Sequence, residues 1–236
     1  MVDWEIKRDP KNKDLVDWKS LEAVLKAEQF ECCALWPLMW KSTAIGLLTA
    51  ADKIYNAYSD ANKREMARFN SGNFKGGILK GQELQDYLDT TYLFPIFLLL
   101  IGYAIENLLK GILYSKYPEL LDETEKGLKF NLKKLNQSLK GHELTLLYKE
   151  AAKVTDLAAL VTETEDILVI LEQCVIWQGR YSLPLNLQQF KNKKQISSSQ
   201  INLEKINDLV SQISSALDKI PNPPTHMEKR TRSKEA

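Results

Sequence analysis

The chain has 236 residues, of which 44% are hydrophobic and 27% are charged, so it is long enough to bury a sizeable core. A formal net charge of +1 excludes a function based on whole-protein attraction to nucleic acid or to a membrane surface. Three cysteines and two histidines lack the spacing of a disulfide framework or a zinc site. The charged start, residues 1–10, lacks the apolar stretch of a signal peptide. We therefore expect a cytoplasmic protein with free thiols and without a bound metal or cofactor.

The amino-terminal third predicts two helices and a loop. Apolar residues recur at helical spacing over residues 14–29, and Pro37 suits the first turn of a second helix that reaches about Asn62. Residues 67–81 are rich in glycine and asparagine, which predicts a loop. We expect residues 1–81 to form an amino-terminal helical extension that ends in this Gly/Asn-rich loop.

The longest predicted helix runs from Gln82 to Lys116. Its middle is apolar almost all round, so other helices must cover it on several sides. The most apolar stretch, residues 92–105, is shorter than the ~20 residues that a bilayer span needs, and Pro95 interrupts it. We therefore expect a buried core helix, kinked or split at Pro95, rather than a membrane span.

The rest of the chain predicts elements that cover this central helix. Residues 122–130 are charged and predict a loop. Apolar stripes at helical spacing predict further helices at residues 141–153, 162–177 and 199–220. Prolines end the last of these, and residues 221–236 are expected to form a disordered charged tail. The predicted fold is all-α, a multi-helix bundle over residues 82–220 around the long buried central helix.

Two of the predicted helices carry polar residues that suit chemistry. Glu106 and Lys110 are four residues apart within the apolar central helix, so they can pair on one face. A charge beside a core needs a partner or a cleft, and a solvated stripe on an exposed face is the alternative. His142 lies at a predicted helix start. Either it serves as a general base or phosphate contact, or it caps and packs the helix.

A third candidate is the turn at residues 177–184, after a predicted buried helix. Trp177 and Tyr181 flank Arg180, and Pro184 prevents a helix from continuing. A guanidinium there can hold a carboxylate in a fork of hydrogen bonds, and it can equally clamp a phosphate.

In chain order, three segments resemble the HEPN superfamily (higher eukaryote and prokaryote nucleotide-binding): Ala104–Gly111, Gly141–Leu144 and Trp177–Pro184. The resemblance covers residues 83–184. HEPN proteins are small helical bundles that often form dimers. Many are metal-independent RNA endonucleases of toxin–antitoxin and phage-defence systems, and others bind nucleotides or partner proteins without cleavage.

The resemblance implies roles for named residues. Arg180 would hold the scissile phosphate, His142 would act as base or acid, and Glu106 would orient one of them. Further binding contacts would come from Lys110, Tyr181, Asn186 and Trp177. Active HEPN proteins resemble one another in an arginine followed closely by a histidine, and here Asn186 stands in the place of that histidine.

Two functions remain open at this point. One is a metal-independent endoribonuclease of a toxin–antitoxin or antiviral defence system. The other is a catalytically inactive helical module that binds a nucleotide or a partner protein, such as a nucleotidyltransferase antitoxin. In both cases the resemblance implies a homodimer. Membrane binding is not expected, because no predicted helix combines a lysine-rich face with exposed bulky apolar residues.

Overall fold

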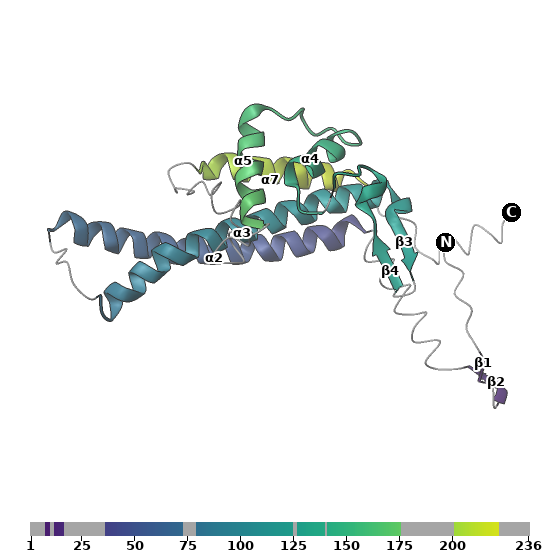
Figure 1. Cartoon of the computed structure of the whole chain (residues 1–236), viewed down its shortest axis with the longest axis horizontal. Helices are drawn as coiled ribbons and strands as arrows, with labels where there is room; N and C mark the ends of the chain where they lie inside the picture. Colours follow the sequence, from purple (N-terminus) through teal and green to yellow (C-terminus); the bar gives the residue numbers. More distant parts are fainter. Residues whose placement is uncertain are drawn as a thin grey trace.

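The computed structural model describes residues 8–9, 12–16, 36–72, 79–124, 127–139, 141–175 and 201–221. These residues form an all-α bundle with two short β-hairpins, which confirms the predicted fold class (Figure 1). The α-helices are α2 (Pro37–Asn70), α3 (Gln82–Lys116), α4 (Leu144–Ala152), α5 (Thr162–Gln173) and α7 (Leu203–Asp218). The antiparallel hairpins are β1 (Arg8–Asp9) with β2 (Asn12–Val16), and β3 (Leu121–Thr124) with β4 (Gly127–Phe130). Short 3-10 turns, η1 (Pro118–Leu120) and η2 (Leu132–Lys134), flank the second hairpin.

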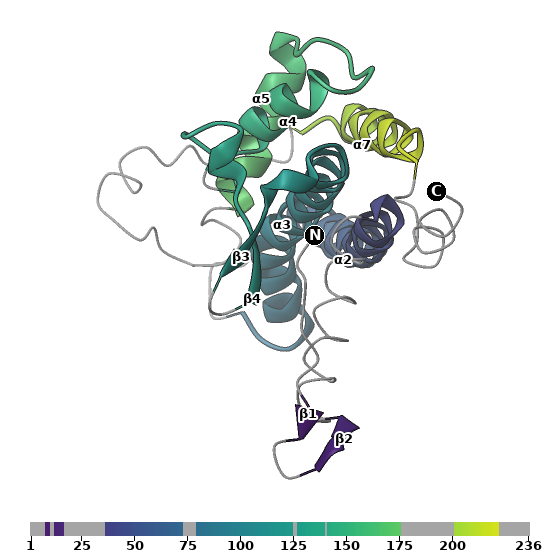
Figure 2. The same ribbon diagram turned by 90° about the vertical axis from the view of Figure 1, so that its right-hand side faces the viewer.

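Helix α3 is the centre of the bundle. It lies antiparallel to α2, α4 and α5 pack against α3, and α7 contacts both α2 and α3 (Figures 1 and 2). By length and composition α3 is long and apolar enough to cross a bilayer, with a mean hydropathy of 1.8 over its most apolar window. However, 67% of that window is buried inside the protein, as in a core helix. Burial of that kind supports a core helix over a membrane span.

The bounds of α3 agree with the prediction, and Pro95 does not split the helix. Proline inside a helix costs about 3 kcal/mol or more, because a backbone hydrogen bond is lost. The residues around it, Phe94, Phe97 and Leu98, are buried in the core. Their burial favours one continuous helix, since each large apolar side chain contributes roughly 1.5–3 kcal/mol.

Three local predictions were wrong: a helix start at what is β2, a loop at what is the β3–β4 hairpin, and the end of α2. The backbone at residues 14–16 is extended in β2 rather than the start of a helix; residues 17–29 lie outside the described part of the chain. Residues 122–124 and 127–130 pair in the β3–β4 hairpin instead of forming a loop, and Phe130 at its end stacks on Tyr114 of α3 with ring centroids 3.6 Å apart. That nonlocal contact is invisible in a charged local sequence.

Helix α2 was predicted to end near Asn62, with a loop from residue 67, but it continues to Asn70. Its last two turns pair with α3. Arg64 donates to Asp86 from Nε at 3.0 Å and from its terminal nitrogen at 2.8 Å, and Arg68 donates at 2.7 Å to the other carboxylate oxygen. Gln82 adds a fourth hydrogen bond at 2.8 Å. These bonds hold a fully buried carboxylate between the two helices.

The paired ends of α2 and α3 project beyond the rest of the bundle (Figure 1). We call this part, residues 59–72 and 79–93, the arm. On the α3 side, apolar residues recur at steps of three and four, and each is at least 36% exposed: Leu84, Tyr87, Leu88, Tyr92 and, just beyond the arm, Ile96. The arm thus has an apolar ridge on its surface and the ion pairs of Asp86 between its helices.

We expect acid to loosen the arm. Hydrogen bonds from Arg64, followed by those from Gln82 and Arg68, hold the pKa of Asp86 well below its usual value, against the opposing effect of burial. Such a group contributes stability that is present above the unfolded value of about 3.9 and is lost as the pH falls through the folded value. Protection factors for amide hydrogen exchange over residues 82–92 should therefore fall below about pH 4.

The matched variants for this test are Asp86→Asn and Asp89→Asn. Asp89 is the next aspartate on the same helix, and it accepts a hydrogen bond from Gln85. Asp86→Asn should lower the protection factors already at neutral pH and remove the acid transition, whereas Asp89→Asn should follow the wild-type profile. A wild-type transition that survives in Asp86→Asn would show that another group controls the arm.

Candidate functional site

A buried carboxylate lies at the centre of the candidate site. The Glu106 side chain is only 7% exposed, on a stretch of α3 whose neighbours Ala104, Ile105 and Leu108 are fully or almost fully buried. A buried charge is costly unless it is paired and hydrogen-bonded. Lys110, one turn further on, supplies the first partner, with Nζ donating to Oε1 at 2.5 Å.

The second partner comes from the segment before α4. His142 Nδ1 lies 2.9 Å from Oε2 of Glu106, so both carboxylate oxygens are engaged. The imidazole is 42% exposed, far more than the carboxylate behind it. An imidazole that is held by a buried acid and open to solvent can exchange a proton with a bound molecule.

The tautomer of His142 follows from this contact. An ionised carboxylate can only accept hydrogen bonds, so Nδ1 carries the proton that is shared with Glu106. In the neutral ring Nε2 then has a free lone pair. Nε2 makes no hydrogen bond to any residue that the structure describes. The free nitrogen can therefore accept a proton from a bound molecule.

A tight turn aims the imidazole. Gly141 has a φ of +109°, a left-handed conformation that favours glycine, and a Cβ at this position would lie 3.8 Å from Nζ of Lys110. Oε2 of Glu143 accepts hydrogen bonds from the backbone N–H groups of Gly141 at 3.0 Å and of His142 at 3.3 Å. Glu143 thereby fixes the backbone that carries the imidazole, immediately before α4 begins.

Two further groups surround the site. Tyr114, two turns after Glu106, is buried, and burial together with the charge of Glu106 raises its pKa. Glu172 of α5 accepts a hydrogen bond from the backbone N–H of Thr145 at 3.4 Å, and burial, with an added effect from the charge of Glu143, raises its pKa. The site therefore lies where α3, the start of α4 and α5 come together.

The structure brings together three of the predicted residues, namely Glu106, Lys110 and His142. The other four lie outside the described residues: Trp177, Arg180, Tyr181 and Asn186. Among the side chains that the structure describes, no three His, Cys, Asp or Glu groups gather as metal ligands.

Sequence reasoning missed the supporting residues Glu143, Tyr114 and Glu172. Glu143 directly follows Gly141 and His142, so its place in the turn gave a usable signal. Tyr114 carried a weaker signal, two helical turns from Glu106 on a similar face. Glu172 carried none, because its role depends on how α5 packs against α4.

Comparisons of this chain with protein-family models, curated proteins and solved structures give no match.

Proposed function

We propose that this protein is a HEPN-like endoribonuclease that needs no metal ion and in which His142 transfers the proton. The observation that supports the proposal most is the Glu106–His142 contact of 2.9 Å, with the exposed face of the imidazole left open. A carboxylate bound to Nδ1 orients the ring and stabilises the imidazolium that forms when Nε2 accepts a proton.

The reaction proposed is cleavage by the neighbouring 2′-hydroxyl of RNA. Nε2 of His142 would take the proton of that hydroxyl while its oxygen bonds to phosphorus and the bond from phosphorus to the 5′-oxygen breaks. A proton from solvent then neutralises the leaving 5′-oxygen. The family resemblance assigns stabilisation of the charged phosphate to Arg180, and binding contacts to Lys110, Trp177, Tyr181 and Asn186. A homodimer in the cytoplasm, paired with an antitoxin such as a nucleotidyltransferase, belongs to the same proposal.

The test is an RNA cleavage assay in the presence of EDTA. A mixed-sequence single-stranded RNA should give products ending in a 2′,3′-cyclic phosphate. The same oligonucleotide with 2′-O-methyl groups should stay intact, since it lacks the attacking hydroxyl. Cleavage of the methylated strand, or a cleavage that EDTA abolishes, would contradict the proposal.

One observation favours a second candidate function, a non-catalytic helical module that binds a nucleotide or a partner protein. Both oxygens of Glu106 are already engaged, by Lys110 and by His142, as in a buried polar network that supports a fold. In that case no RNA is cleaved at any protein concentration. Glu106→Gln would then lower the melting temperature of a protein that has no cleavage activity to lose.

A further inference from the structure

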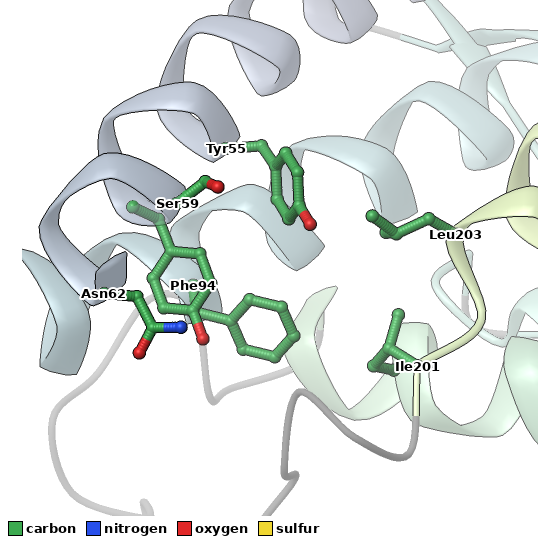
Figure 3. Close-up of a pocket in the computed structure, with 7 residues that line it drawn as sticks. Tyr55, Ser59, Asn62, Phe94, Ile201 and Leu203 are labelled. Atoms are coloured by element: carbon green, nitrogen blue, oxygen red, sulfur yellow. The ribbon is translucent and has the colours of Figure 1, made fainter. Parts of the chain in front are cut away.

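A cavity of about 270 Å³ lies where the arm leaves the bundle, between α2, α3 and the start of α7. Figure 3 shows Tyr55 and Phe94 on one side of it, with Ile201 and Leu203 on the other. The rings that line it belong to a cluster of four aromatic side chains, with centroid separations of 5.0 Å for Tyr55–Phe97 and for Tyr58–Phe94. The cavity is therefore a slot between an aromatic wall and an aliphatic wall.

The polar groups of the cavity are few and uncharged. Ser59 and Asn62 line it from α2, and both are partly buried (Figure 3). Neither their side chains nor the Tyr55 hydroxyl makes a hydrogen bond to another residue in the described part of the chain. None of the lining side chains is charged. The lining thus suits a flat uncharged group with a polar edge, and it offers nothing to a phosphate.

Size and hydrogen bonding narrow the ligand class. An apolar cavity of about 150 Å³ holds benzene, so 270 Å³ has room for a second fused ring. The carboxamide of Asn62 presents a donor and an acceptor side by side. Asparagine pairs through both with the N6 and N7 edge of adenine, and aromatic side chains stack on the faces of bases.

We propose that this cavity binds an adenine-type purine base, stacked between the two walls and held at its edge by Asn62. The base can come from a free nucleoside or from an unpaired position of an RNA strand, and the chemistry of the pocket is the same in both cases. The inference does not rest on RNA cleavage, because neither Glu106 nor His142 lines the cavity.

The experiment measures binding of adenosine and of the oligonucleotides rA6 and rU6 to the full chain, by saturation-transfer NMR and equilibrium dialysis. Asn62→Leu should weaken adenosine or rA6 binding about tenfold or more, since a bidentate pair contributes about 1–3 kcal/mol. Asn56→Leu is the matched control, because Asn56 is exposed on the same helix outside the cavity. Leu203→Trp should abolish binding by filling the slot.

Comparing the two kinds of ligand identifies the source of the base. Binding of rA6 well above that of adenosine identifies an RNA strand, and equal binding identifies the nucleoside. Wild-type melting temperatures for Asn62→Leu and Asn56→Leu establish that the folds are intact. The proposal is overturned if neither adenosine nor rA6 binds saturably, if rU6 binds as well as rA6, or if Asn62→Leu and Asn56→Leu bind equally.

Discussion

Replacing His142 by asparagine is expected to lower the rate of RNA cleavage at least 100-fold, because a positioned acid–base group contributes about 10²–10⁴-fold. The amide nitrogen of asparagine can take the place of Nδ1 and donate to Glu106, which keeps the buried carboxylate paired. The new side chain has no Nε2 and cannot take up a proton near neutral pH. The variant should therefore lose its rate while it keeps its melting temperature. Single-turnover cleavage in EDTA, with thermal melts of both proteins, measures both quantities.

The other histidine of the chain supplies the matched control. His226→Asn makes the same chemical change outside the described residues, and it should cleave at the wild-type rate. A His142→Asn protein that retains most of its activity would remove His142 from the mechanism. If both variants are equally slow, the effect does not arise at the site on α3 and α4.

The second large effect is expected at Gly111, where α3 approaches α2 closely. A Cβ added to Gly111 would lie 2.7 Å from Cβ of Trp40 and 3.0 Å from its Cγ. These atoms are near the Trp40 backbone, so they cannot rotate away as the tip of a flexible side chain can. Gly111→Ala favours the helix by about 1 kcal/mol, but overpacking costs about 1–3 kcal/mol. We expect a net loss of up to about 2 kcal/mol in the free energy of unfolding.

Gly46→Ala is the control for this substitution. Gly46 is exposed within α2, and a Cβ there would meet no atom within 4 Å. With helix propensity alone in play, Gly46→Ala should raise the free energy of unfolding by up to about 1 kcal/mol. Urea titrations followed by circular dichroism measure both variants. Shifts of the same sign would show that α3 and α2 have room to separate at Gly111.

The central helix was predictable because its signals are local. Its apolar residues repeat at helical spacing, and Pro118 prevents it from extending beyond Tyr117. The last turns of α2 were missed, because Arg64 and Arg68 look solvated until Asp86 of another helix accepts their hydrogen bonds. The β3–β4 hairpin was missed for the same reason, since Phe130 stacks on Tyr114, which lies on another element.

The candidate site likewise has one part with a local sequence signal and other parts that depend on contacts between distant residues. Pairing of Glu106 with Lys110 follows from their spacing on one helix, and the structure has it. The approach of His142, 36 residues further along the chain, was expected only from the family resemblance. The cavity beside Asn62 has no sequence signature at all, because its walls come from three elements that meet only in the fold.

The ion pairs of Arg64 and Arg68 with Asp86 also fix how α2 and α3 are aligned along their axes. Sliding α2 past α3 by one helical turn, ~5.4 Å, would carry both arginines away from a carboxylate that water cannot reach, so the two helices have one permitted alignment. At a rise of ~1.5 Å per residue, Asp86 and Glu106 are about 30 Å apart along α3. Leu88 and Tyr92 of the apolar ridge therefore lie roughly 27 Å and roughly 21 Å along α3 from Glu106, which holds the imidazole of His142.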